Sequence, residues 1–200
     1  MSDETKVTLS AGELAMAIDK NIILTKQAIS DKTFSLFGSM VPLITNEFKP
    51  ALHQNSKLSG AIPKIYKGEN YLGFPFVMMD YPAVFEKDNI FAVRTMFWWG
   101  NFISITLHLS GMHKKYWENK LMKKLETHPD IFIAVGEEEW QHHFEENNYV
   151  AYFLLSREQK ENICGKKFIK IALKYELHHW NMMQSILPVG YKTMADLLLL

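Results

Sequence analysis

One turn signal within a run of β-forming residues constrains this chain more than any other feature. The pair Gly100-Asn101 separates residues 90–99 from residues 102–110, and both segments are rich in aromatic and β-branched residues. Such a pair between two runs of this kind predicts a tight β-hairpin. With these two residues as the loop, Arg94 pairs with Leu107, and paired residues share a face of the hairpin.

This register gives the hairpin two different faces. One face is apolar except for an arginine and consists of Ala92, Arg94, Met96 and Trp98 opposite Leu109, Leu107, Ile105 and Ile103. The other mixes aromatic side chains with small polar groups and a histidine, and consists of Phe91, Val93, Thr95, Phe97 and Trp99 opposite Ser110, His108, Thr106, Ser104 and Phe102. A hairpin with apolar residues on both faces is expected in the middle of a sheet that is covered on both sides.

The composition is that of an ordinary globular domain. Of 200 residues, 48% are hydrophobic and 22% are charged, which predicts a single domain over residues 1–200. Lys plus Arg and Asp plus Glu both number 22, so no net positive charge favours nucleic-acid binding. The single cysteine, Cys164, excludes an internal disulfide framework.

Targeting and cofactor motifs are absent from the sequence. The acidic start lacks the apolar segment of a secretory signal, and no apolar run approaches the ~20 residues of a membrane-spanning helix. These features predict a soluble, cytoplasmic protein without membrane association. No phosphate-binding glycine motif and no nucleophile elbow occurs, so we expect no cofactor.

Helical segments flank the hairpin and predict an α+β domain with a central, mainly antiparallel sheet of about four strands. Residues 11–49 have helical periodicity and begin with a capping box of Ser10 and Glu13. Within them, Asp31 is a candidate cap for a second helix, and Pro42 predicts a kink or a new start.

The rest of the chain divides into three parts. Glycine and proline punctuate residues 50–89, which predicts a long irregular loop, a kind of segment that is often functional. Residues 90–155 predict the sheet with intervening helices, and residues 156–199 predict helices. Helices are expected at 114–126, 137–146, 156–175 and 181–199, and further strands at 131–135 and 149–155.

The segment 167–177 has two interpretations. Lys167, Lys170 and Lys174 lie on one helical face, whereas Ile169 and Ile171 alternate with them as they do in a strand. We prefer the helix.

Part of the sequence resembles a known group of proteins. The motifs Gly68-Glu69-Asn70-Tyr71 and Asp80-Tyr81-Pro82 and the segment from Phe91 to Asn101 resemble those of uncharacterised bacterial proteins of about 200 residues. The resemblance covers mainly residues 64–111. It implies no function, because no activity is known for that group.

The arginine of the hairpin indicates a candidate ligand site. Among apolar side chains, an unpaired guanidinium is costly, so Arg94 needs a carboxylate or an anionic ligand. One interpretation is a structural ion pair with Asp80 or Glu69. In the other, Arg94 binds a small anion in a pocket with aromatic walls. The candidate ligand-binding residues are Glu69, Tyr71, Asp80, Tyr81, Arg94, Trp98 and His108.

Two Glu-x-x-His pairs suggest a different function, a metal-dependent enzyme. The pairs are Glu139 with His142 and Glu176 with His179. On helices such pairs bring both ligands to one face, as in di-iron carboxylate bundles. Both lie in polar runs that are expected to face water, so no metal site is favoured.

The last residues suggest a third function, that of an interaction protein. The run from Leu197 to Leu200 predicts either docking on the chain's own core or a homodimer through the C-terminal helix. The sequence therefore favours a protein that binds a small anionic ligand beside the 90–110 hairpin. A metal-dependent enzyme and a non-catalytic homo-oligomeric protein are the alternatives.

Overall fold

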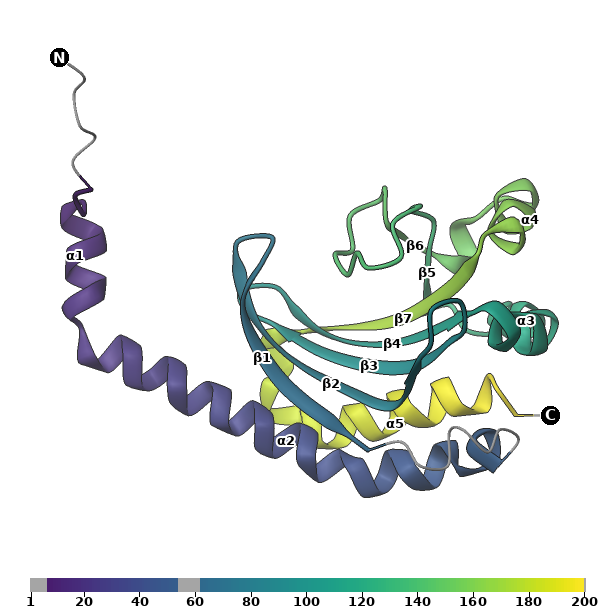
Figure 1. Cartoon of the computed structure of the whole chain (residues 1–200), viewed down its shortest axis with the longest axis horizontal. Helices are drawn as coiled ribbons and strands as arrows, with labels where there is room; N and C mark the ends of the chain where they lie inside the picture. Colours follow the sequence, from purple (N-terminus) through teal and green to yellow (C-terminus); the bar gives the residue numbers. More distant parts are fainter. Residues whose placement is uncertain (1–6, 54–61, 200) are drawn as a thin grey trace, which may run out of the picture.

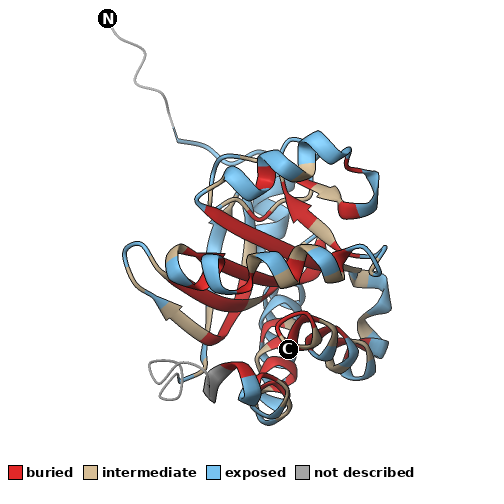
Figure 2. Ribbon diagram, turned by 90° about the vertical axis from the view of Figure 1, so that its right-hand side faces the viewer, coloured by how far each residue is buried: buried red, intermediate tan, exposed pale blue. Residues whose placement is uncertain are grey.

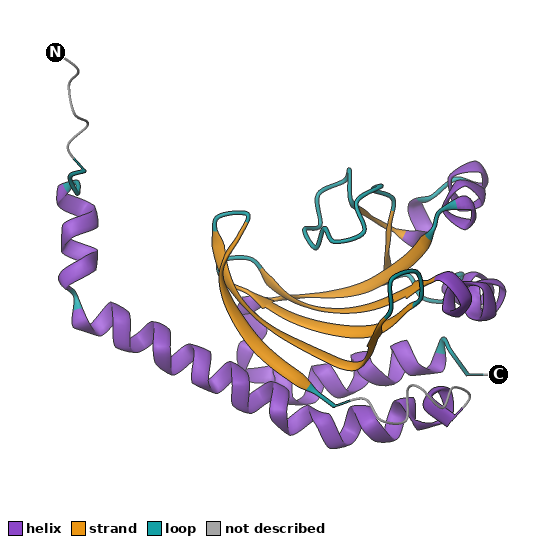
Figure 3. Cartoon of the chain, viewed as in Figure 1, coloured by secondary structure: helices purple, strands orange, loops and turns teal. Residues whose placement is uncertain are grey.

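The computed structural model describes residues 7–53 and 62–199, which form one antiparallel sheet and the helices around it (Figures 1 and 3). Its strands are β1 (Lys64–Tyr71), β2 (Phe74–Phe85), β3 (Ile90–Trp98), β4 (Phe102–Ser110), β5 (Phe132–Ala134), β6 (Tyr149–Ala151) and β7 (Phe168–Glu176). They are ordered β1-β2-β3-β4-β7-β5-β6 across the sheet. The α+β class is confirmed, but the sheet has seven strands instead of about four.

The helices follow the same chain order. They are α1 (Ala11–Ile18), α2 (Lys20–His53), α3 (Gly111–Leu125), α4 (Arg157–Gly165) and α5 (Met183–Asp196), with 3₁₀ turns η1 (Tyr152–Leu154) and η2 (Leu177–Met182). Among the described residues, no helix has both the length and the apolar character that a bilayer crossing requires.

The sheet is curved, and its two faces have different covers (Figure 1). α2 and α5 lie against the convex face, where apolar residues of β2, β3, β4 and β7 form the main core with them. Figure 2 shows the central strands and the inner sides of these helices as the buried part of the molecule. The concave face is covered by residues 135–148, which connect β5 to β6 and are called the cover loop below.

The central hairpin forms with a register that differs by one residue from the predicted one. Its loop has three residues, because the Asn101 amide donates to the Trp98 carbonyl at 3.0 Å and Gly100 adopts a φ of 70°. A glycine accepts that left-handed conformation without the penalty that a side chain brings. Trp98 therefore pairs with Phe102.

The observed register gives the arginine different neighbours from the predicted ones. Arg94 pairs with Thr106, not with Leu107, and its face of the sheet also carries Ser104 and His108. The purely apolar strand partners lie on the opposite face, where the helices cover them. Apart from Thr95, the polar groups of the two hairpin strands thus share the concave face with the arginine.

The segment predicted to be an irregular loop contains two long strands, so that prediction is wrong. Its glycines and prolines stand at positions that a strand pair tolerates. Leu72 and Gly73 form the β1–β2 turn with φ of 50° and 86°. The cis bond between Tyr81 and Pro82 lies in a bulge of β2, and Gly68 leaves room for the ring of Phe76.

The N-terminal helices break at a different residue from the predicted one. The capping box of Ser10 and Glu13 is present. α1 then ends at Ile18, and the carboxylate of Asp19 accepts a hydrogen bond from the Asn21 amide at 2.8 Å, which caps α2. α2 continues through Asp31 and Pro42, so no new helix begins at either residue.

The C-terminal half confirms some of the predicted elements and corrects others. α3, β5 and the start of a strand at Tyr149 are confirmed. The predicted helix over 137–146 is wrong, since these residues belong to the cover loop. The helix predicted over 156–175 is α4 followed by β7, and the strand alternation in 168–176 prevails because both faces of β7 are covered.

The leucines at the end of the chain dock on its own core. Leu197 and Leu198 are buried, and they pack within the main core beside α5. The apolar area that suggested a homodimer through the C-terminal helix is therefore covered within the chain, and such a dimer stays a prediction without that support. Leu200 lies outside the described residues.

Candidate functional site

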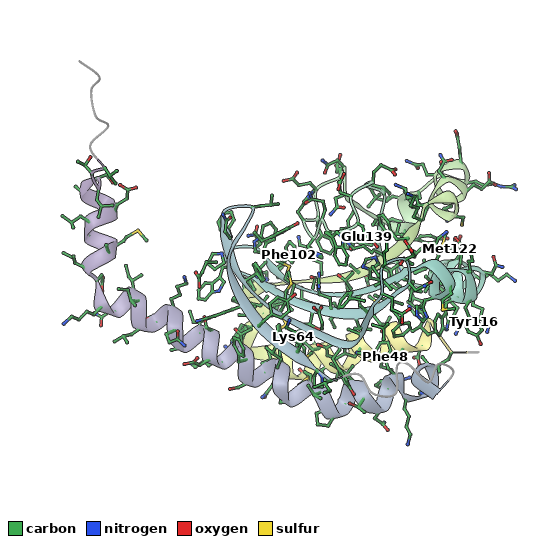
Figure 4. All side chains as sticks on the ribbon, in the orientation of Figure 1. Phe48, Lys64, Phe102, Tyr116, Met122 and Glu139 are labelled. Atoms are coloured by element: carbon green, nitrogen blue, oxygen red, sulfur yellow. The ribbon has the colours of Figure 1, made fainter. Side chains whose placement is uncertain are left out.

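Polar and charged side chains lie side by side under the cover loop, on the concave face. Asp80, Arg94 and Thr106 occupy one row across β2, β3 and β4, since they pair in register. His108 of β4 pairs with Lys170 of β7 in the next row. All of them are buried except Arg94, which is mostly buried. In Figure 4 the labelled Glu139 of the cover loop lies above the sheet, on this side.

A bidentate ion pair joins Arg94 to Asp80. The guanidinium donates from Nε to Oδ1 at 2.7 Å and from Nη2 to Oδ2 at 2.9 Å. Burial acts to lower the pKa of Arg94, but the hydrogen bonds and charge of Asp80 outweigh it and raise that pKa. The ion pair between Arg94 and Asp80, one of the two interpretations of the sequence, is therefore present, with the geometry of a bidentate pair.

Arg94 also holds the cover loop. Its Nη1 donates to Nε2 of His142 at 3.0 Å, and the His142 amide donates to the Tyr71 hydroxyl at 2.6 Å. Burial, followed by the charges of Lys170 and Arg94, lowers the pKa of His142 well below its usual range. His142 is therefore neutral at pH 7 and accepts the hydrogen bond from the arginine.

A second histidine binds the loop one strand further along the sheet. Nε2 of His108 lies 2.9 Å from Oε1 of Glu139. Burial and the cations Lys170 and Arg94 lower the pKa of His108 to about 3, so the neutral ring donates to the carboxylate. Burial also raises the pKa of Glu139.

Lys170 is a buried ammonium that binds backbone carbonyls of the cover loop. Its Nζ donates to the carbonyl of Glu139 at 2.9 Å and to that of Gln141 at 2.6 Å. The side chain is 1% exposed. Burial and the nearby Arg94 lower its pKa to about 7, against the opposing effect of Glu139.

A pocket of about 390 Å³ opens where this polar layer reaches the surface. Its lining includes the charged groups of Lys64, Asp80 and Arg94 and the rings of Tyr66, Phe85 and Trp140. The guanidinium carbon of Arg94 lies 5.8 Å from the ring centres of both Phe85 and Trp140. Arg94 thus forms one wall of a solvent-reached pocket while it remains paired with Asp80.

The arginine keeps a hydrogen-bond donor for a further partner. Of its five N–H groups, two donate to Asp80, one to His142 and one to Tyr66 at 3.5 Å. Within the described part of the chain, the second N–H of Nη1 has no such partner. The pocket therefore combines a positive group with aromatic walls, and its arginine keeps one N–H without a partner among the described residues.

The structure distributes the predicted ligand-binding residues over several places. Asp80, Arg94 and His108 come together under the cover loop. Tyr71 and Trp98 pack against each other nearby, with ring centres 5.1 Å apart, and Tyr71 binds the loop instead of lining the pocket. Tyr81 and Glu69 point elsewhere, and bind Thr45 of α2 and Lys26 respectively.

The two Glu-x-x-His pairs lie far apart. Glu139 and His142 contact the sheet beside Lys170, whereas Glu176 is six residues further along β7, about 20 Å at the rise of a strand. Glu176 forms an ion pair with Lys174, and the ring of His179 lies against that of His178 at an interplanar angle of 58°. No group of three His, Cys, Asp or Glu side chains in the described ranges is placed to hold a metal ion.

Several residues of the site were missed by reasoning from the sequence. Tyr66 and Phe85 lie in strands that were interpreted as a loop, and Trp140 and Lys170 in segments that were interpreted as helices. A strand interpretation of 168–176, which its alternating isoleucines allowed, places Lys170 on the inner face of a covered sheet. A buried lysine there indicates a polar site.

Comparison of the chain with protein-family models, with curated proteins and with solved structures finds no match.

Proposed function

We propose that this protein binds a small organic anion in the pocket beside the 90–110 hairpin. The observation that carries the proposal is the lining, in which Lys64 and Arg94 stand with the rings of Tyr66, Phe85 and Trp140 around about 390 Å³. This volume is within the range of pockets that hold small molecules. A ligand with a carboxylate attached to a planar apolar group can pair with the cations and pack on the rings.

The charge of the lining favours a monoanion. Two cations, Lys64 and Arg94, face one carboxylate, that of Asp80, so the pocket carries one excess positive charge. Asp80 holds the guanidinium in place. The free N–H of Nη1 is available to donate a directional hydrogen bond to a bound anion. We also propose that the protein acts in the cytoplasm, the location that its sequence predicts.

The rings supply an apolar surface that remains in contact with water. Phe85 is 48% exposed and Trp140 is 49% exposed, and their ring centres are 6.1 Å apart at an interplanar angle of 51°. A flat ligand that packs on either ring removes this area from water and interacts with the aromatic face. The proposal assigns a binding function and no reaction.

Thermal melting with a matched pair of probes tests this function. Benzoate combines a carboxylate with a ring, and benzamide has the same shape without the charge. We expect benzoate, but not benzamide, to raise the melting temperature, because a ligand that binds only the folded state stabilises it. Calorimetric titration of benzoate then gives its affinity.

Two variants locate the binding site. We expect Lys64→Ala and Trp140→Ala each to weaken benzoate binding by about tenfold, which corresponds to ~1.4 kcal/mol. Lys67→Ala on the same strand and Tyr116→Ala on α3, both at exposed positions, serve as matched controls. Equal responses to benzoate and benzamide, or an affinity unchanged by the two pocket variants, contradict the proposal.

A further inference from the structure

The N-terminal arm, residues 7–24, extends away from the sheet without a cover from its own chain (Figure 1). Every residue in it is exposed except Asp19, which is intermediate. The arm is nevertheless built as a helix, since Ser10 and Glu13 cap α1 and Asp19 caps α2. A capped helix with no packing partner gains little stability from its sequence alone, because most helical stability comes from tertiary packing.

The exposed side chains of the arm are strongly apolar. Seven large apolar residues are between 46% and 69% exposed, namely Leu9, Leu14, Met16, Ile18, Ile22, Ile23 and Leu24. At on the order of 100 Å² for each such half-exposed side chain, they leave roughly 700 Å² in water. A standard protein interface buries about 800 Å² on each partner, so the arm alone nearly supplies one.

An apolar groove lies at the base of the arm. One pocket of about 550 Å³ lies between α2 and the tips of the β1–β2 and β3–β4 hairpins, and a second of about 360 Å³ lies between α2 and η2. Both are lined by Ile29 and Trp99, so the two pockets adjoin, and together they are called the groove. Phe74, Phe97 and Trp180 complete its apolar walls.

The charges of the arm favour a second copy of this chain over a membrane surface. Within the arm, the acidic residues Glu13 and Asp19 and the single basic residue Lys20 leave one net negative charge. Helices that lie on membranes carry a basic polar face, which is absent here. An arm that is mainly apolar and carries little net charge can pack on an apolar surface of a second copy without strong repulsion.

From the uncovered arm and the adjacent groove we infer that two copies of this protein form a two-fold dimer by exchanging arms. The arm of each copy lies in the groove of the other, so Leu14 and Ile18 pack against the partner's Phe74, Trp99 and Trp180. The same patch serves on both copies, and the assembly closes at two. The proposed ligand pocket lies outside this interface, so either proposal stands without the other.

Sedimentation velocity and light scattering of the full chain at tens of micromolar test this dimer. We expect twice the chain mass of 23.3 kDa. The double variant Leu14→Lys with Ile18→Lys is expected to be monomeric and to keep its fold, because both positions are exposed within one chain. Leu154→Lys, at an exposed leucine of η1 remote from the arm, is the matched control and stays dimeric.

Mixing two variants distinguishes arm exchange from a simple pairing of arms. Trp99→Lys damages the groove, and Leu14→Lys with Ile18→Lys damages the arm without touching the groove lining, so each protein alone is expected to be monomeric. A mixture restores one intact arm–groove contact and is expected to give heterodimers with at least tenfold stronger association than either variant. Circular dichroism checks the fold of every variant.

Four results overturn the inference. They are a monomer for the unaltered chain at these concentrations, a dimer that survives the double arm variant, a mixture that stays monomeric, and growth into open-ended assemblies. A monomer that binds vesicles of anionic lipid through the arm identifies a membrane as the partner and also overturns it.

Discussion

The two faces of the sheet are covered in different ways. The convex face meets α2 and α5 through apolar side chains, with two hydroxyl pairs among them, Thr95 with Tyr191 at 2.6 Å and Thr45 with Tyr81 at 2.7 Å. The concave face meets the cover loop through Phe144, which stacks on Tyr149, and through a layer of buried charged and titratable groups.

This difference shows which interactions hold each cover on the sheet. Helices bury a continuous apolar stripe, so many interchangeable contacts fix α2 and α5. A loop offers few apolar contacts and many backbone groups, and here charged side chains satisfy them. The concave face should therefore respond to single polar substitutions and to pH, whereas the convex face should respond to volume.

The largest expected effect on the concave face comes from the ion pair. Arg94→Leu leaves the buried carboxylate of Asp80 without its partner and is expected to lower the free energy of unfolding by about 3–5 kcal/mol. The double variant Arg94→Leu with Asp80→Asn should recover much of that loss, because neither full charge remains. Urea titration of the wild type, both single variants and the double variant measures the coupling, and additive losses contradict it.

Acid is the next largest perturbation, and it should act through the two neutral histidines. Unfolded histidine binds a proton near pH 6.5, whereas the folded pKa of His108 is about 3 and that of His142 is also far lower. The unfolded state therefore takes up protons first as the pH falls. Each histidine should lower stability by about 2 kcal/mol between pH 7 and pH 5, and stability is regained above pH 6.5.

Substitutions on the two faces separate this pH effect. His142→Gln should remove about half of the loss on going from pH 7 to pH 5. Phe91→Leu, within the core of the convex face, should lower stability by the same amount at both pH values. A loss on acidification that persists unchanged in both His108→Gln and His142→Gln assigns the effect to other groups.

A smaller effect is expected from Lys170, and it should appear at basic pH. Lys170→Met strands the carbonyls of Glu139 and Gln141 and should cost about 1–3 kcal/mol at pH 7. The folded pKa of about 7 lies below that of an unfolded lysine, so the wild type should gain stability as the pH rises from 7 to 10. The variant should lose that gain, whereas Lys167→Met at an exposed neighbouring position should keep it.

The smallest effect is expected within the apolar face. Thr95→Val removes one partner of the buried hydroxyl pair and should cost about 1 kcal/mol, independent of pH. Adding Tyr191→Phe should cost little more, because no unpaired hydroxyl then remains. Chemical denaturation at pH 5 and pH 7 checks both, and a clear pH dependence contradicts the description of this face as uncharged.

Local signals predicted local structure well. The capping box at Ser10 places a helix start correctly, and the pairing of Arg94 with Asp80 follows from the cost of a buried guanidinium. The hairpin register was wrong by one residue because two-residue and three-residue loops at Gly100 look alike in sequence.

The missed parts of the site depend on tertiary contacts. Residues 137–146 are polar enough to resemble an exposed helix, and their contacts with Arg94, His108 and Lys170 of the sheet beneath fix them as a loop. The strands β1 and β2 contain glycines and prolines that a bulge and a turn accommodate, and sequence periodicity does not show either. Trp140 and Phe85 therefore meet at the pocket without any local motif.

Hydrogen exchange at pH 7 and pH 5 tests most directly whether polar groups hold the cover loop. After correction for intrinsic exchange rates, the amides of residues 139–143 should lose protection by about 30-fold for each histidine that opening exposes, since opening lets it bind a proton. The amides of α5, on the convex face, should keep their protection. Equal changes in both regions, or none in the cover loop, contradict the account.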